Sequence, residues 1–175
     1  MGYIKEFDRQ ATSLIRFLPS RWRPLMQSLS FLGEPVVVVT AGLAGYAAAS
    51  IRGQEASQRA FIYALVAYGV GIGIKRIFRR DRPNHLNVES FGIKSYSFPS
   101  GHAFGSLIFY GLFAVIDARH LLFPWDFLSA MIIWAIIFCI GISRVYLKSH
   151  YPSDVAGGWL FGAAALVIIV QTALK

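Results

Sequence analysis

Long apolar runs separated by short polar segments make up most of the chain. Five of these runs approach the length of about 20 residues that an α-helix needs to cross a bilayer. They cover residues 36–51, 60–74, 101–116, 127–142 and 155–174. The first is short and rich in glycine and alanine, which favours close packing against neighbouring helices. The pattern therefore predicts an all-α fold, a polytopic membrane helical bundle of about five transmembrane helices.

The N-terminal part of the chain follows a different pattern. Apolar side chains recur at helical spacing across residues 3–17, with charged side chains between them. This spacing is typical of an amphipathic helix that lies in the membrane interface. A second, shorter amphipathic stretch covers residues 25–32. We expect a single domain of residues 1–175, with interfacial helices in 1–35 and the transmembrane bundle in 36–175.

Composition supports this prediction and narrows the partners. The chain of 175 residues is 55% hydrophobic and only 15% charged, which fits a polytopic membrane protein better than a soluble domain. Its net charge of +8 comes from basic residues at the ends of apolar runs, where they would meet lipid headgroups or an anionic substrate. We therefore expect a bilayer and no nucleic acid as partner. Oligomeric state stays open.

The most informative polar segment, residues 143–154, lies between the last two runs. Charged groups beside a membrane core are costly, which favours a functional interpretation. Pro152 is suited to the first turn of a helix, and Asp154 then falls where the helix dipole favours a carboxylate. From there it can reach back to His150 and leave the other ring nitrogen free as a nucleophile or base. Arg144 adds a cation, and the alternative is a capping loop with a surface histidine.

A second basic segment follows the second run. The helix of this run is expected to continue into Lys75 and Phe78. Lys75 precedes Arg82 by about two helical turns, and Pro83 ends the helix or forces an extended bend beside Arg82. Two cations held in this way can grip the oxygens of one phosphoryl group. We interpret the other arginines of this segment, Arg76, Arg79 and Arg80, as positively charged membrane anchors.

A third motif opens the third run. Ser100 is a natural N-cap, and the exposed N–H groups of a first helical turn form an anion site. Gly101 allows close approach of the backbone to a ligand, and His102 projects beside it. A plain capping turn with a partly buried histidine is the alternative. The end of the second run and the start of the third lie on one side of the membrane, and the chain returns to that side at the end of the fourth run and the start of the fifth. All three motifs are therefore expected at the same membrane face.

Together the three motifs resemble those of the type 2 phosphatidic-acid phosphatase superfamily. The pattern of that family is Lys-x6-Arg-Pro, then Pro-Ser-Gly-His, then Ser-Arg-x5-His-x3-Asp. Here it is matched by Lys75 with Arg82-Pro83, by Pro99 to His102, and by Ser143-Arg144 with His150 and Asp154.

The resemblance implies a membrane lipid phosphatase that forms a phosphohistidine on His150. Asp154 would orient that nucleophile, and His102 would be the acid for the leaving group. The phosphate would be held by Lys75, Arg82, Ser100, Gly101 and Arg144. Because cations already surround the phosphate, the implied enzyme needs neither a metal nor another cofactor.

Other functions are compatible with the same motifs. A phosphohistidine can be discharged to an alcohol, which would make the chain a lipid phosphotransferase, and a lipid-binding protein without activity is a further alternative. The resemblance extends to vanadium-dependent haloperoxidases, which are large and soluble, unlike this chain. Polyprenyl phosphates or diphosphates, phosphatidic acid and phosphatidylglycerol phosphate all fit as substrates. We expect the loop of residues 84–96 to help select the headgroup, which exchanging this loop would test.

The expected location is a bacterial inner membrane, with the site at one face. Non-catalytic basic residues on the site's side outnumber those opposite, which by the positive-inside rule favours the cytoplasmic face. On the site's side they are Lys5, Arg9, Arg16, Arg21, Arg23, Arg76, Arg79, Arg80, Lys94 and Lys148, against Arg52, Arg59, Arg119 and Lys175. The family resemblance favours the outer face instead.

Overall fold

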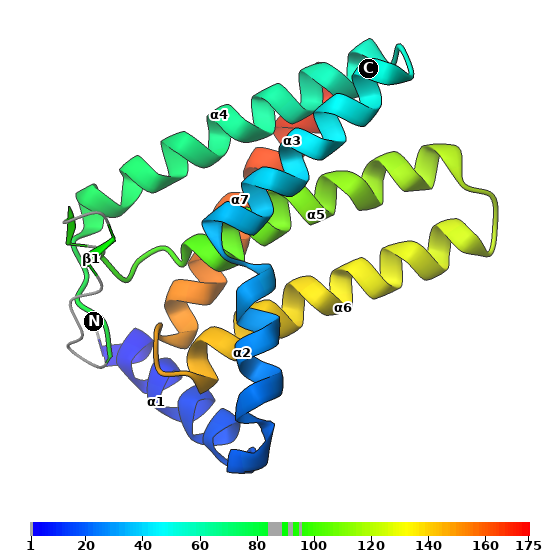
Figure 1. The fold of residues 1–175 in the computed structure, drawn as a ribbon. Helices are drawn as coiled ribbons and strands as arrows, with labels where there is room; N and C mark the ends of the chain where they lie inside the picture. Colours follow the sequence, from blue (N-terminus) through cyan, green and yellow to red (C-terminus); the bar gives the residue numbers. More distant parts are fainter. Residues whose placement is uncertain (1, 84–88, 91–92, 95) are drawn as a thin grey trace.

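The computed structural model describes residues 2–83, 89–90, 93–94 and 96–175, and these are mainly helical (Figure 1). The helices are α1 (Gly2–Arg16), the 3-10 turn η1 (Ser20–Trp22), α2 (Arg23–Leu32), α3 (Pro35–Ile51), α4 (Glu55–Phe78), α5 (Gly101–His120), α6 (Trp125–Tyr146) and α7 (Pro152–Ala173). Two short strands, β1 (Glu89–Ser90) and β2 (Ile93–Lys94), pair antiparallel between α4 and α5. The all-α prediction is confirmed.

Four helices, α4 to α7, are long and apolar enough to cross a membrane. The segment of η1 and α2 joins α3 at an angle of 47°, and the two together would form a fifth span. The bend lies at Gly33-Glu34-Pro35, where the proline lacks an N–H and begins the new helix. The described structure thus contains four spans, or five if the bent pair is one.

Helix α5 is the centre of the bundle and contacts α3, α4, α6 and α7. Its side chains Phe104, Ile108, Phe109 and Leu112 are buried in the main hydrophobic core. Large apolar side chains on the outer faces of α4, α6 and α7 are exposed, among them Val66, Ile132 and Val167. Outer faces of this kind match a lipid environment, in which apolar surface needs no protein partner.

Several helices extend beyond the predicted apolar runs. Helix α4 begins at Glu55, five residues before the predicted apolar run of residues 60–74, and only residues 121–124 separate α5 from α6. Hydropathy marks where a helix is apolar, whereas the backbone hydrogen bonds continue into its polar ends. At its other end α4 reaches Phe78, the residue to which the sequence predicted that the helix continues. It stops at Phe78 because Arg79 adopts a left-handed conformation with φ 47°, so Lys75 and Arg82 do not share a helix.

The segments that carry the three motifs lie at one end of the bundle, as expected (Figure 1). The linker from α4 to α5 and the loop from α6 to α7 both lie there, beside α1, and the C-terminus lies at the opposite end. The loop of residues 84–96, expected to select the headgroup, falls largely outside the described residues.

The first turns of α5 and α7 lie in direct contact because the residue of α7 at the contact, Gly158, has no side chain. The backbone N–H of Ser100 donates to the carbonyl of Asp154 at 2.9 Å. A Cβ atom added at Gly158 would lie 2.6 Å from the carbonyl oxygen of Ser100 and 2.9 Å from Cβ of Ala103. Only a glycine at position 158 permits this approach, which joins the second motif to the third.

Replacing Gly158 with alanine should therefore destabilise the fold, by about 1–3 kcal/mol, because the added methyl group overlaps backbone that cannot move aside. Thermal unfolding of purified protein in detergent would measure the loss as a lower midpoint. Gly73→Ala is the matched control, since a Cβ at that helical position meets nothing within 4 Å. Its midpoint should equal or exceed that of the wild type, because alanine favours helix more than glycine. Equal effects of the two substitutions would contradict this account of the α5–α7 contact.

Candidate active site

His150 and Asp154 form a buried pair at the junction of α6 and α7. Their side chains are 1% and 0% exposed, and Nδ1 of His150 lies 3.6 Å from Oδ2 of Asp154. The backbone N–H groups of Ser149 and His150 donate to the carbonyl of Arg144, which closes the loop after α6. Pro152 then begins α7 and places Asp154 in its first turn, as predicted.

Three further groups bind the carboxylate of Asp154. The N–H of Tyr151 donates to Oδ2 at 2.8 Å, and the hydroxyl of Ser97 donates to the same oxygen. Nη1 of Arg80 donates to Oδ1 at 2.7 Å. The Ser97 hydroxyl also lies 3.4 Å from Nδ1 of His150, so it contacts both members of the pair.

The role predicted for Arg80 is wrong. Sequence reasoning grouped it with Arg76 and Arg79 as a membrane anchor, and those two are exposed. The left-handed turn at Arg79 redirects the chain, so that Arg80 points back into the site and pairs with Asp154. Ser97 and Arg80 were both missed as site residues because their partner lies more than 50 positions away in the sequence.

The first turn of α5 lies next to this pair. Ser100 stands at the N-cap position, but its hydroxyl does not form the predicted capping hydrogen bond. Instead Oγ of Ser100 is buried and has no hydrogen-bond partner among the described residues. Gly101 faces Lys75, since a Cβ atom at this position would lie 3.3 Å from the Lys75 ammonium nitrogen.

His102, also in the first turn of α5, is paired with Glu34. Its Nε2 atom lies 3.1 Å from Oε1 of Glu34, at the bend between α2 and α3. The histidine side chain is 11% exposed, whereas that of Glu34 is 44% exposed. Glu34 was not predicted, because an isolated glutamate before a proline resembles an ordinary helix start.

Two of the predicted phosphate-binding residues frame the loop that carries His150. Nη1 of Arg82 donates to the carbonyl of Ser149 at 3.3 Å. Arg144, in the last turn of α6, is buried, and its Nη1 donates to the hydroxyl of Ser30. Nε of Arg144 has no hydrogen-bond partner among the described residues.

The electrostatic environment keeps His150 neutral. Burial is the largest effect and lowers the pKa of His150 to about 3. The nearby charges of Lys75, Arg82 and Arg144 lower this pKa further, and only the contact with Asp154 opposes them. The three cations therefore lie within electrostatic range of one imidazole that is unprotonated at neutral pH. Burial likewise lowers the pKa of Arg82, against the attraction of Asp154.

The structure thus brings together all eight residues predicted from the motifs. Buried polar atoms without partners cost about 1–3 kcal/mol each, and Ser100 and Arg144 both carry one. An anion bound among these residues would accept hydrogen bonds from both. Across the described ranges, no group of three or more His, Cys, Asp or Glu side chains is placed to hold a metal ion.

The model of the PAP2 superfamily matches residues 57–175, more than half of the chain. The chain belongs to the PAP2 superfamily. Its N-terminal helices lie outside that match, although they supply Glu34 and Ser30 to the site. Together with the apolar helices, membership in this family identifies the chain as a multi-pass membrane protein.

Two relatives and one solved structure are similar to this chain. The chain is 34% identical over 100 residues to a lipid A 1-phosphatase of Rhizobium johnstonii, a match that covers 51% of this chain and 36% of the relative. It is 32% identical to the decaprenylphosphoryl-5-phosphoribose phosphatase of Mycolicibacterium smegmatis, covering 75% of this chain and 68% of the relative. The crystal structure of a PAP2-type phosphatidylglycerolphosphate phosphatase from Bacillus subtilis matches with a TM-score of 0.78 and 22% identity. That match covers 98% of this chain and 86% of the other, and it shows the fold.

Burial of a neutral His150 should make folding stability depend on pH. The folded protein binds a proton at His150 only near pH 3, whereas the unfolded chain binds it near the ordinary pKa of 6.5. The unfolded state therefore binds more protons between these values, and stability falls as the pH is lowered through this window. Lowering the pH from about 7 to about 5 should cost about 2 kcal/mol through His150 alone.

Unfolding midpoints of the wild type and His150→Gln at both pH values would measure this contribution. The variant should lose less stability on acidification than the wild type, because glutamine does not titrate. His120→Gln, at the exposed end of α5, is the matched control and should retain the pH dependence of the wild type. An identical pH dependence in all three proteins would contradict the burial of a neutral imidazole at position 150.

Proposed function

We propose that this chain is a membrane lipid phosphatase that works through a phosphohistidine intermediate on His150. The observation that carries the proposal is the neutral imidazole of His150, held beside Asp154 within range of three cations. A neutral imidazole is nucleophilic, and the cations match the charge of a phosphate group. The named relatives, a lipid A 1-phosphatase and a decaprenylphosphoryl-5-phosphoribose phosphatase, support the same class of reaction.

In the first step, His150 attacks the phosphorus of the lipid phosphate. Asp154 accepts a hydrogen bond from the N–H at Nδ1 of His150. This contact fixes the tautomer in which Nε2 of His150 carries the free electron pair. The N–P bond forms as the bond from phosphorus to the lipid oxygen breaks. His102 donates a proton to that departing oxygen, and such positioned acid catalysis is worth roughly 10²–10⁴-fold. The lipid leaves as an alcohol, or as a monophosphate where the substrate is a diphosphate.

In the second step, water attacks the phosphohistidine. His102, now unprotonated, accepts a proton from this water, and the N–P bond breaks to release inorganic phosphate and neutral His150. Glu34 contacts His102 in the unliganded protein and is suited to orient its ring in both steps.

The remaining predicted residues would hold the phosphate. Lys75, Arg82 and Arg144 would neutralise charge on the equatorial oxygens, the task that metal ions perform in other phosphoryl-transfer enzymes. Ser100 and the backbone at Gly101 would add donors from the N-terminus of α5. Three fixed cations supply the electrostatic stabilisation without a metal, so we propose metal-independent turnover.

The substrate class follows from the position of the site, which lies where the membrane-spanning helices α5 and α7 begin and α6 ends. A lipid whose tail lies in the bilayer can present its phosphate there. Polyprenyl phosphates or diphosphates, phosphatidic acid and phosphatidylglycerol phosphate meet this requirement. Residues 1–175 would act as one lipid-phosphatase domain, since the N-terminal helices contribute to the same site.

Phosphate release from a panel of these lipids by detergent-purified protein tests the proposal. The wild type should release inorganic phosphate equally with and without a chelator. His150→Ala should lower the rate by on the order of 10³-fold or more, because the covalent route is lost. His120→Ala is the control and should retain the wild-type rate. Loss of activity in the chelator, restored by magnesium, would contradict the metal-independent mechanism.

The same assay separates the alternative activity. A phosphotransferase would yield a phosphorylated acceptor when an alcohol is added, in place of free phosphate. Binding of a lipid phosphate without any release would instead indicate a non-catalytic protein.

For location we propose a bacterial inner membrane with the site at the cytoplasmic face. The charge bias supports this side even when Arg80 is removed from the count, since nine non-catalytic basic residues remain there against four opposite. The N-terminus lies at the end of the bundle that carries the site, and the C-terminus lies at the other end (Figure 1).

Reporter fusions at each terminus would test this orientation. A reporter that works only in the cytoplasm should be active at the N-terminus and inactive at the C-terminus. The reverse result would place the site at the outer face and would show that the excess of basic residues on the side of the site does not set the topology.

A further inference from the structure

Asp8 is buried in a helix that is otherwise largely exposed. Its exposure is 5%, although the apolar side chains of α1, such as Tyr3, Phe7 and Leu14, are open to the surroundings. An amphipathic helix that buries a carboxylate and exposes its apolar side chains reverses the usual arrangement of a soluble protein. Buried carboxylates are retained where they are paired, so the partners of Asp8 indicate its role.

Both oxygens of Asp8 are engaged by the elements that carry the site. Oδ1 accepts a hydrogen bond from the N–H of Ser153 at 2.8 Å, in the first turn of α7. Oδ2 accepts from the hydroxyl of Ser153 at 2.8 Å and from Nη2 of Arg80 at 2.7 Å. Asp8, a residue of α1, therefore caps the N-terminus of α7 and also binds Nη2 of the Arg80 guanidinium group.

The other terminal nitrogen of Arg80, Nη1, binds the carboxylate of Asp154. Nη1 donates to Oδ1 of Asp154 at 2.7 Å, and the guanidinium carbon lies 4.3 Å from the centre of the Tyr151 ring. Arg80 thus joins two carboxylates that are 146 positions apart in the sequence, one in α1 and one beside the nucleophile. The planar guanidinium group suits this task because its donors have a fixed geometry.

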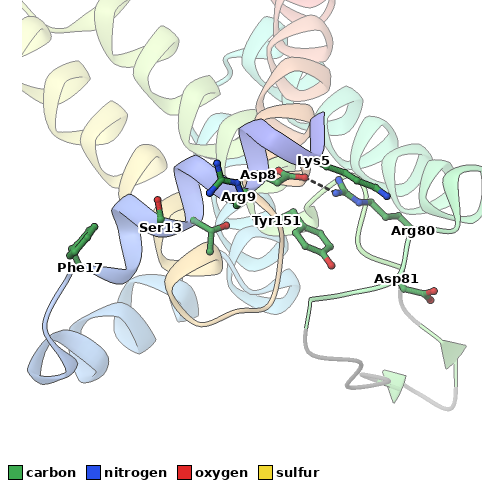
Figure 2. A pocket seen from close by; sticks show the side chains of 9 residues that line it. Lys5, Asp8, Arg9, Ser13, Phe17, Arg80, Asp81 and Tyr151 are labelled. Atoms are coloured by element: carbon green, nitrogen blue, oxygen red, sulfur yellow. Dashed lines mark hydrogen bonds and ion pairs between the residues drawn. The ribbon is translucent and has the colours of Figure 1, made fainter. Parts of the chain in front are cut away.

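A groove borders Arg80 on the side facing α1 (Figure 2). It has a volume of about 810 Å³ and is lined by residues of α1 together with Arg80, Asp81 and Tyr151. The Arg80 side chain is 29% exposed, and the groove offers space into which it can move. The pairing with Asp8, together with a hydrogen bond from Nη1 of Arg80 to Oγ of Ser153 at 2.7 Å, holds the guanidinium group against Asp154.

We propose that Asp8 and Arg80 are positioning residues for the reaction, so that docking of α1 is required for full activity of His150. The proposal rests on the proposed function, in which His150 is the nucleophile. Asp154 fixes the orientation of His150, and a buried carboxylate keeps its own orientation only while its donors are in place. Arg80 supplies the donor to Oδ1, and Asp8 keeps Arg80 there.

The test compares steady-state kinetics of Asp8→Asn and Arg80→Met with those of two matched controls. The controls are Glu6→Gln, on the same helix, and Arg76→Met, an exposed arginine four positions before Arg80. Phosphate release would be measured from a lipid phosphate in detergent, after size-exclusion chromatography confirms that each variant is folded. Neither control should change kcat by more than about twofold, because Glu6 pairs only with Arg9 and Gln10 among the described residues.

Loss of either positioning residue should lower kcat about 10–100-fold, the usual cost of losing a group that orients a catalytic side chain, with little change in KM. The double variant Asp8→Asn with Arg80→Met should lower kcat by much less than the product of the two single effects, because Asp8 acts on Asp154 mainly through Arg80. A purely structural role for α1 would instead lower the folded fraction and leave kcat per folded molecule unchanged.

Arg80→Lys adds a conservative variant in case Arg80→Met fails to fold. Lysine keeps the charge but has a single ammonium group, so it should retain the fold and rescue only part of kcat. Wild-type kcat in folded Asp8→Asn and Arg80→Met, or full rescue by Arg80→Lys, would overturn the proposal. No phosphate release by the wild type would instead show that the proposed function has failed, which separates the two.

Discussion

The carboxylate of Asp154 is the group on which the arrangement of the site depends. It is wholly buried, and a buried carboxylate is tolerated only when donors surround it. Those donors come from separate parts of the chain, namely Arg80 after α4, Ser97 before α5 and the N–H of Tyr151 before α7. Satisfying one charge therefore brings the ends of three helices together. The position of His150 follows from that convergence, because its ring rests against the same carboxylate.

Small residues allow the helices to meet closely enough for this. The first turns of α5 and α7 share a hydrogen bond from Ser100 to Asp154, and Gly158 leaves no side chain between them. In a lipid environment such close contact replaces the hydrophobic effect as the source of helix association. The same contact sets the distance between the two halves of the site. A change in packing at Gly158 would act on the chemistry as well as on stability.

The fold and the motif residues could be predicted because their signals are local. Apolar runs mark the spans, and the i, i+4 spacing of His150 and Asp154 places both around one helix start. Glu34, Ser97, Arg80 and Asp8 could not be found in this way, since each is a single polar residue whose partner lies far along the chain. The path of the chain directly after α4 could not be predicted either. It depends on a left-handed conformation at Arg79, which is not a glycine and carries no signal in the sequence.

The charges around His150 explain why the site suits an anion. Lys75, Arg82 and Arg144 lie near one imidazole, and their charges contribute to keeping His150 unprotonated. In the proposed mechanism, a phosphate would relieve the repulsion between these cations, and part of its binding energy would come from cations already held in place. Asp154 attracts Arg82 and so offsets part of this repulsion, although its carboxylate also accepts hydrogen bonds from Arg80, Ser97 and the N–H of Tyr151. In the proposed mechanism, the pairing of Arg80 with Asp154 would hold the carboxylate that orients His150, while Lys75, Arg82 and Arg144 would bind the substrate phosphate.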